Sequence, residues 1–487
     1  MSAASVSQAR PLIVVMKFGG TSVEDAVAMK RTSLIVRGRR ERGLQPVVVV
    51  SAMAKVTDQL IAAAAAAGRD DRHEALKISA KLRERHLSTA AELVHGEQLV
   101  DVLSLLHHDF DALDDLLRGI AAVGELTART NDLVVSFGER MSSRMVAAAF
   151  LELGLNGAHV DARTCIVTDS TYGKAAPQEA EIETRLVANV LPMIEAGQTP
   201  IMGGFIGSNA QGITTTLGRG GSDYTAALVG GGLHAGAIEI WTDVNGIMTT
   251  DPRICPDALR VKTISFEEAA ELAYFGAKVL HPATILPAVQ KSIPVWVLNS
   301  RNPSNEGTKI TAVAPHCSSP FKSIAAKKKL TIIDIVASRM LMAHGFLKAV
   351  FDVFDKYHCA IDMVSTSEVS VSVTVDSNEQ LPAICDDLSR IADVKYEGRK
   401  ALVCLVGEDI RGHNGIAGRV FSAISHVNLR MISQGASEIN MSFMIEEEDV
   451  EEAIRSLHKA FFTNPDETVF DVAALRESNL AQVPSIQ

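Results

Sequence analysis

The segment Lys17–Ser22, KFGGTS, combines a lysine with two glycines in a spacing that suits phosphate binding. Glycines let backbone N–H groups approach an anion closely, and the N-terminus of a following helix adds the positive end of its dipole. Lys17 would bring a full positive charge to a transferred phosphoryl group. The segment is neither a P-loop nor a GxGxxG motif. By itself it is better explained as a plain turn between a strand and a helix, with a solvated lysine.

A second segment, Gly203–Asp223, is dense in glycine and ends in a Ser-Asp pair that can cap a helix beginning at Tyr224. Arg219 lies among glycines that would let a small anion approach it. A long hairpin with turn glycines explains the glycines. It does not explain why Arg219 and Asp223 stand four residues apart in so bare a setting.

Two further segments carry polar side chains near expected strand and helix ends. Trp241–Arg253 contains Thr242-Asp243 at a strand end, where open α/β sheets place ligands. In Phe275–Pro282, FGAKVLHP, Lys278 could reach a phosphate, whereas His281 fits a structural helix end better than a catalytic base. Ordinary turn residues remain the alternative for the first of these segments.

The expected elements place these segments on an α/β core. A buried strand at Leu12–Lys17, a helix over Ser22–Arg42 and a second strand at Pro46–Ser51 form a βαβ unit, which implies a parallel sheet with a right-handed crossover. Residues 55–155 are expected to be a mainly helical excursion. Later elements alternate between strand and helix, as in an α/β sandwich: Pro200–Gly204, Ser222–Gly230, Ala237–Thr242, Phe266–Phe275 and Pro294–Leu298.

The C-terminal part contains an internal repeat. Gly345–Phe351 matches Gly415–Phe421, and Ser367–Asp376 matches Ser437–Glu446, both at an offset of 70 residues. Each copy is expected to run strand, helix, strand, strand, helix, strand. Strict alternation predicts a one-sided antiparallel sheet with four valines on one face: Val369, Val371, Val373 and Val375.

Composition narrows the class of protein. The net charge of -11 argues against a general binder of nucleic acids or anionic membranes. The six cysteines form no CxxC pair, so we expect neither a zinc site nor a redox motif. No apolar run reaches the roughly 18 residues that span a bilayer. The first eleven residues resemble neither a signal nor a transit peptide, which predicts a cytoplasmic protein.

Taken together and in this order, KFGGTS, GRGGSD, TTDPR and FGAKVLHP resemble the aspartate kinase family, from about Ile13 to Phe462. The segment Ser136–Met145, SFGERMSSRM, and the tandem repeat belong to the same resemblance. It implies an amino-acid kinase fold, with a mainly parallel sheet sandwiched by helices, followed by two α+β ACT-like domains. The expected divisions are a catalytic domain at 12–302, a linker at 303–328, ACT-like domains at 329–398 and 399–470, and a tail at 471–487.

The resemblance also implies roles for individual residues. Lys17 would contact the phosphates and stabilise the transferred charge, and Asp223 would orient Lys17. Glu139 and Arg219 would bind the ammonium and carboxylate of L-aspartate, in a pocket also lined by Ser51 and Thr57. The residues implied to bind ATP are Lys17, Gly19, Gly20, Thr242, Asp243, Met248, Arg253 and Lys278. Met248 departs from the family pattern, in which many relatives have tyrosine.

The implied chemistry is phosphoryl transfer to the side-chain carboxylate, giving 4-phospho-L-aspartate. A carboxylate oxygen is already a nucleophile, so in-line positioning and neutralisation of charge matter more than a general base. Two lysines, loop N–H groups and Mg²⁺ would supply that neutralisation. The chain shows no dense carboxylate cluster, so we expect no protein-held metal and Mg²⁺ bound mainly through ATP oxygens and water.

The first repeat resembles the lysine-responsive type of ACT domain, which implies feedback inhibition by L-lysine. Asp362 and Glu368 are candidate acceptors for its ε-ammonium. The implied effector contacts are Met340, Gly345, Phe346, Leu347, Ile361, Asp362, Thr366, Ser367 and Glu368. For each residue singly, a turn or strand-edge role is an equal alternative. ACT-like pairs imply a homodimer, with a tetramer left open.

Two other functions stay open at this point. One is a kinase acting on glutamate or N-acetylglutamate, against which the repeat and the SFGER segment argue. The other is a catalytically weak amino-acid sensor, against which the intact Lys17, Arg219, Asp223 and Lys278 argue. Nothing resembling a dinucleotide domain follows Phe462, so we expect a monofunctional enzyme.

Overall fold

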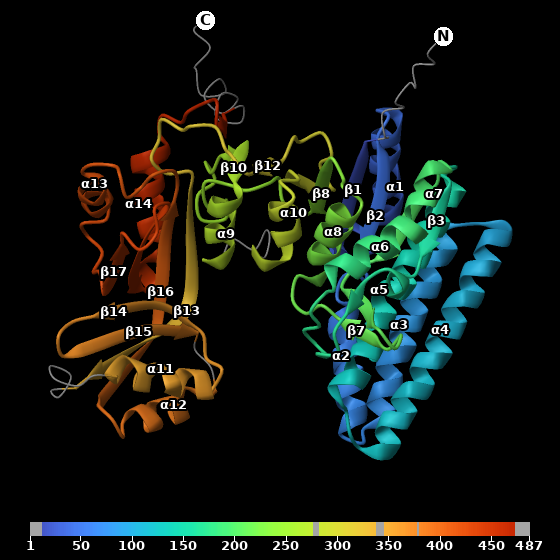
Figure 1. Cartoon of the computed structure of the whole chain (residues 1–487), viewed down its shortest axis with the longest axis horizontal. Coiled ribbons are helices and arrows are strands. Elements are labelled where there is room, and N and C mark those ends of the chain that lie inside the picture. The colour runs from blue at the N-terminus through green and yellow to red at the C-terminus, as the bar shows by residue number, and fades with distance from the viewer. Residues whose placement is uncertain (1–11, 276–281, 338–344, 377–378, 473–487) are drawn as a thin grey trace, which may run out of the picture. The chain divides into compact units, whose positions relative to one another are not determined.

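The computed structural model describes residues 12–275, 282–337, 345–376 and 379–472 (Figure 1). These residues form two compact units. The first comprises the described residues of Met1–Gly246 and Val279–Ala314, and the second those of Ile247–Lys278 and Pro315–Gln487. The division differs from the expected domain boundaries, because residues 247–275 fold with the C-terminal part of the chain.

A largely parallel sheet forms the centre of the first unit. Its strands in this unit run in the order β12-β11-β8-β1-β2-β5-β3, and only β12 is antiparallel to its neighbour. Both faces of the central strands are buried, which is why their sequences are apolar without alternation. The bounds are β1 Ile13–Phe18, β2 Gln45–Val50, β3 Gly157–Val160, β5 Thr199–Gly203, β8 Ala237–Thr242, β11 Val295–Asn299 and β12 Thr308–Thr311.

Helices cover this sheet and form the long excursion seen in Figure 1. Side-chain caps start several of them: Asp25 accepts the N–H of Ala28, and Thr127 accepts that of Thr130. The expected helical character of residues 55–155 is confirmed. The helices of the unit are α1 Ala26–Glu41, α2 Val56–Gly68, α3 Arg72–Leu93, α4 Gly96–Val123, α5 Ala128–Glu152, α6 Glu179–Asn189, α7 Leu191–Glu195, α8 Gly221–Gly232 and α10 Leu286–Gln290, with short 3₁₀ turns at Gly20–Ser22, Ala162–Thr164 and Pro282–Ile285.

The glycine-dense segment contains a hairpin as well as a helix start. The strands β6 Ile206–Asn209 and β7 Thr214–Thr216 are antiparallel and form a small sheet with β4 Val167–Thr168. The chain then passes through Gly218 and Gly220, both with positive φ, into α8. Hairpin and helix start therefore coexist, and the loop between them carries Arg219.

The second unit contains a six-stranded antiparallel sheet in the order β14-β15-β13-β16-β18-β17. Its strands are β13 Ser323–Val336, β14 Ile361–Thr366, β15 Ser370–Asp376, β16 Asp393–Val406, β17 Met431–Gln434 and β18 Asn440–Glu446. Its helices in this part are α11 Phe346–Lys356, α12 Leu381–Leu388, α13 Ile416–Ala423 and α14 Val450–Phe462, with a 3₁₀ turn at Glu447–Asp449. The repeat is visible as two sets of two strands and two helices, joined through the long β13 and β16.

The long strands cross the expected boundaries. All of β12 and the first residues of β13 fall within 303–328, which was expected to be a linker. Ser323–Lys327 pairs with Leu402–Val406, so the start of β13 adds a strand to the second repeat rather than the first. A register shift follows at Lys327, and Lys329 has φ +64°. The lysine run thus marks an irregularity within a strand, which from sequence is indistinguishable from a polar linker.

The predicted valine face is confirmed for three positions. Val371, Val373 and Val375 are fully buried on β15. Val369 lies before the strand begins and is 37% exposed, so its placement on that face was wrong. The Val369 carbonyl still accepts the N–H of Ala337, directly after β13, but the residue lies outside β15.

Residues 247–275 are fixed within the second unit by specific bonds. This segment contains β9 Arg260–Val261, β10 Thr263–Ser265 and α9 Phe266–Tyr274, and β9 pairs with the C-terminal β19 Phe470–Asp471. A capping box joins Ser265 and Glu268 at the start of α9. Glu268 also forms a 2.8 Å ion pair with Lys322, and both side chains are almost wholly buried. Among all described residues, no helix is long and apolar enough to cross a membrane.

Candidate functional site

Lys17 and Asp223, the two predicted catalytic residues, meet in the first unit. Lys17 is near the end of β1, the central strand, and Asp223 is the third residue of α8. Lys17 Nζ lies 2.7 Å from Asp223 Oδ1, and the two side chains are only 12% and 15% exposed. The first turn of a helix favours a carboxylate, since backbone N–H groups there lack intrahelical partners. Asp223 is thus held at a position where it fixes the direction of the ammonium group.

The glycines after β1 keep the space near that ammonium open. A Cβ at Gly19 would stand 3.7 Å from Lys17 Nζ, and one at Gly20 would stand 3.1 Å from the carbonyl oxygen of Ala52. The Gly19 N–H donates to the carbonyl of Trp241 at 3.1 Å, which ties the turn to β8. Gly19 and Gly20 therefore bring no side-chain atoms next to Lys17 and Ala52, while phosphate binding by the KFGGTS segment stays a prediction.

Ser51 connects three elements around the pair. It follows β2, its Oγ donates to Ser222 Oγ at 3.1 Å, and its carbonyl accepts the hydroxyl of Ser142 at 2.8 Å. A Cβ on Gly204 would meet the Ser222 side chain at 2.7 Å, so this glycine permits the close approach. The predicted Thr57 is the second residue of α2 and is half-buried. Sequence reasoning did not single out Ser142 or Ser222, although both lie within motifs quoted for the resemblance.

Glu139 lies on α5 and is only 3% exposed. Its Oε1 accepts the backbone N–H of Ala52 at 3.2 Å, whereas no described residue bonds to the buried Oε2. Burial outweighs that bond and raises the pKa of Glu139 to about 8. A Cβ on Gly203 would meet the Glu139 Cβ at 2.9 Å, so β5 can approach the helix only through glycine. A buried carboxyl with one free oxygen is suited to receive a cationic group.

Arg219 is exposed in the loop before α8. Gly218 and Gly220 on either side have φ of +77° and +72°, conformations that strongly favour glycine. Because both neighbours of Arg219 are glycines, no adjacent side chain covers its exposed guanidinium, which is accessible to an anion.

The predicted nucleotide residues are distributed over both units. Thr242 ends β8 in the first unit, and its hydroxyl donates to Asp243 at 3.2 Å. Met248 and Arg253 belong to the second unit, where the Met248 carbonyl accepts from Ser323 and Arg253 pairs with Asp251 at 2.6 Å. Lys278 lies outside the described residues, and so does His281.

The predicted effector residues surround the start of α11 and the turn after β14. Gly345 has φ +89° and precedes α11, which Phe346 and Leu347 begin. Ile361, Asp362 and Thr366 lie on β14, and Ser367 and Glu368 form the turn to β15. Met340 is outside the described residues.

Asp362 is already ion-paired within the chain. Lys327 Nζ lies 2.9 Å from each oxygen of Asp362 and 3.1 Å from Asp376. The Asp362 side chain is only 4% exposed. The carboxylate predicted to accept an effector ammonium therefore binds the ammonium of Lys327 in this structure, a contact that sequence spacing did not reveal.

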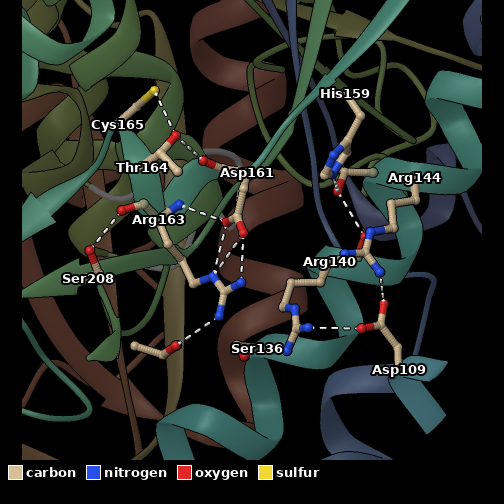
Figure 2. Close-up of polar contacts among 12 residues, drawn as sticks. Asp109, Ser136, Arg140, Arg144, His159, Asp161, Arg163, Thr164, Cys165 and Ser208 are labelled. Carbon is tan, nitrogen blue, oxygen red and sulfur yellow. Dashed lines mark hydrogen bonds and ion pairs between the residues drawn. The ribbon is translucent and has the colours of Figure 1, made fainter. Parts of the chain in front are cut away.

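A second polar cluster includes two arginines of α5, Arg140 and Arg144 (Figure 2). The buried Asp109 of α4 pairs with Arg140 at 2.8 Å and also with Arg144, one helical turn further along α5. Asp161 pairs with Arg163 at 2.6 Å beside them. Residues four apart share a helix face, so the spacing of the two arginines in SFGERMSSRM was a signal for a common partner.

No group of three or more His, Cys, Asp or Glu side chains that could hold a metal ion occurs in the part of the chain that the structure describes.

Comparisons with known proteins agree with this geometry. The family described as "Amino acid kinase family" matches residues 12–299, and an ACT domain family matches residues 403–461. Aspartokinase 2, chloroplastic, of Arabidopsis thaliana is 38% identical over 476 residues, covering 94% of this chain and 86% of that protein.

Two solved structures of Escherichia coli aspartokinase III resemble the chain closely. The complex with aspartate and ADP, described as the R-state, has a TM-score of 0.80 at 36% identity and covers 92% of this chain and 100% of that one. The complex with lysine and aspartate, described as the T-state, has a TM-score of 0.79 at 36% identity and covers 92% and 99%.

Proposed function

We infer that this chain, which belongs to the amino acid kinase family and within it to the aspartokinases, phosphorylates the side-chain carboxylate of aspartate with ATP. The product is 4-phospho-L-aspartate. The observation that carries this function within the chain is the Lys17–Asp223 ion pair beside the Gly19-Gly20 turn, together with the buried Glu139 on α5.

We propose that Glu139 and Arg219 bind the two ends of the α-amino acid. Glu139 offers a buried carboxyl oxygen to the α-ammonium, and Arg219 offers an accessible guanidinium to the α-carboxylate. Ser51 and Thr57 would line the pocket between them. With its α-groups held, the substrate presents its side-chain carboxylate to the phosphoryl donor, and the reaction becomes effectively unimolecular.

Lys17 would stabilise the charge that spreads over the transferred phosphoryl group. Asp223 holds the Lys17 ammonium in place before substrate arrives, so little reorganisation is needed during transfer. The backbone at Gly19 and Gly20 fits a phosphate because no side chain fills the space beside Lys17. Thr242, Asp243, Met248, Arg253 and Lys278 would bind the rest of the nucleotide.

Mg²⁺ would accompany ATP, held mainly by nucleotide oxygens and water. When bound, it would supply further neutralisation of phosphate charge. The residues of this chain that act on the same charge are Lys17 and, by proposal, Lys278.

An assay that traps the acyl phosphate with hydroxylamine tests the function directly. The protein is incubated with ATP and Mg²⁺ and either aspartate or glutamate, and Lys17→Met serves as the inactive comparison. We expect hydroxamate from aspartate only. Equal product from glutamate would assign another amino-acid kinase, and no product from either would favour a sensor without catalysis.

We also propose that L-lysine inhibits the enzyme through the first ACT-like repeat, with the two repeats joining a homodimer. Support comes from the lysine complex of the similar E. coli protein, and effector binding through Asp362 would have to compete with its ion pair to Lys327. Activity is measured while lysine rises from about 10⁻⁶ to about 10⁻² M, a span that covers micromolar to millimolar affinities. A flat curve would refute the inhibition, and a monomer in sedimentation at working concentration would refute the dimer.

A further inference from the structure

Asp132 is a fully buried carboxylate outside the predicted site. It lies in the second turn of α5 and is 0% exposed. Its Oδ2 accepts the backbone N–H groups of Gly173 and Thr216 at 3.0 and 2.9 Å, and its Oδ1 accepts the Thr216 hydroxyl at 2.8 Å. A buried acid is costly unless its oxygens are satisfied, so this arrangement is specific.

Thr216 ends the strand that leads to Arg219. It is the last residue of β7, and only Leu217 and Gly218 separate it from the arginine. Its own carbonyl accepts the N–H of Ala175 at 2.9 Å, and a Cβ on Gly218 would lie 3.0 Å from the carbonyl oxygen of Gly173. Asp132 thus bonds to two residues next to the start of the Arg219 loop: Thr216, which leads into the loop, and Gly173, which lies against Gly218.

Asp132 and Glu139 lie on the same face of one helix. Seven residues are almost two full turns, about 10 Å along the axis. Asp132 therefore connects the strand that leads to the Arg219 loop with the helix that carries Glu139. The distance between Glu139, proposed to bind the α-ammonium, and Arg219, proposed to bind the α-carboxylate, therefore depends on the bonds that Asp132 makes from α5.

We propose that Asp132 is a positioning residue that fixes Arg219 relative to Glu139 and so determines recognition of the α-carboxylate of aspartate. The inference rests on the proposed substrate roles of these two residues. Asp132 itself touches no substrate. Loss of its bonds would let the loop move, and a displacement of about 1 Å in a positioned group can reduce turnover about a hundredfold.

The experiment compares aspartate with its α-amide, in which a neutral amide group replaces the α-carboxylate. ADP release is measured at saturating ATP for wild type, Asp132→Asn and Arg219→Ala. We expect both variants to raise the KM for aspartate at least about tenfold and to reduce the preference for aspartate over the amide. The KM for ATP should change less than about twofold. Asp114→Asn, which removes a partly buried carboxylate bonded to Ser79 and Arg83 on α3, is the control and should retain the preference.

Variants of Thr216 keep the test decisive if Asp132→Asn fails to fold. Thr216→Val removes the hydroxyl donor while keeping the backbone N–H, and Thr216→Ser restores the donor. We expect the valine variant to shift the aspartate-to-amide preference in the same direction and the serine variant to rescue it. If Arg219→Ala lowers the preference for aspartate over the amide but Asp132→Asn or Thr216→Val leaves it unchanged, the positioning role of Asp132 is refuted. The proposed substrate role of Arg219 then still stands. A wild-type preference retained in Arg219→Ala overturns the proposed substrate role, and the inference with it.

Discussion

The buried Glu139 predicts that aspartate binding strengthens as pH rises toward 8. Burial raises the pKa of Glu139 from 4.5 to about 8, so about one molecule in ten carries the charge at pH 7 in the free enzyme. Binding an ammonium requires the ionised form. The apparent affinity for aspartate should therefore rise by up to about tenfold per pH unit well below 8 and level off above it.

The assay is the KM for aspartate at pH 6, 7 and 8 with saturating ATP, for wild type and Glu139→Gln. The glutamine keeps the side-chain shape but cannot ionise, so its KM should be high and nearly constant over this range. A wild-type KM that does not fall with pH would refute the reasoning. So would an equally steep fall in Glu139→Gln, because another group would then be titrating.

The same group predicts an effect on stability with a definite sign. The pKa of Glu139 is higher in the folded protein than in the unfolded chain, so its contribution favours folding fully below about pH 4.5 and is lost as pH rises through 8. The difference corresponds to at most about 5 kcal/mol, at about 1.4 kcal/mol per pKa unit. Urea unfolding should thus show Glu139→Gln gaining much more stability relative to wild type at pH 9 than at pH 5.

Three further variants test other parts of the molecule. Lys17→Met should lower kcat about 10²- to 10³-fold in the hydroxamate assay, since it removes a preorganised charge that is proposed to lie next to the transferred group; near-normal turnover would exclude Lys17 from the phosphate contacts. Lys327→Met frees the Asp362 carboxylate and should lower the lysine concentration for half-inhibition about tenfold, whereas a rise would show that Lys327 helps to bind the effector. Asp109→Ala leaves two partly buried arginines without their shared partner and should destabilise the protein by about 3–5 kcal/mol in urea titrations, and a change below about 1 kcal/mol would contradict this.

Local patterns predicted the strands that build the site. Ala237–Thr242 agrees with β8 at both ends, and the first two strands were each displaced by one residue. These runs are apolar because the sheet is covered on both faces, so burial alone identifies them. The Lys17–Asp223 contact follows from the same topology, because β1 is central and α8 starts beside its carboxyl end.

Pairing between segments that are far apart in the sequence could not be predicted from local patterns of residue type. The start of β13 pairs with the far half of β16, 75 to 83 residues later in the chain, and no local signal distinguishes that strand from a linker. The Lys327–Asp362 bond and the bonds of Asp132 to Thr216 are likewise tertiary contacts between distant segments. Residue type showed which groups can bond, but only the fold shows which groups meet.

The segment 247–275 is built into the unit that holds the repeats. Thr249 bonds to His458 at 2.9 Å and accepts the N–H of Ile324 through its carbonyl at 2.7 Å. Arg260 pairs with Asp471, and Asn440 donates to Glu271. These bonds tie the segment to both ends of the C-terminal half.

A chimaera that exchanges regulatory halves between family members should therefore not be joined at residue 303. Residues 247–275 would have to be exchanged together with residues 315–472 as one segment, because the bonds of Thr249, Arg260 and Glu271 join the two. Met248 and Arg253, which are proposed to bind ATP, would then come from the donor of the C-terminal half, and by that proposal the nucleotide affinity of such hybrids should follow that donor.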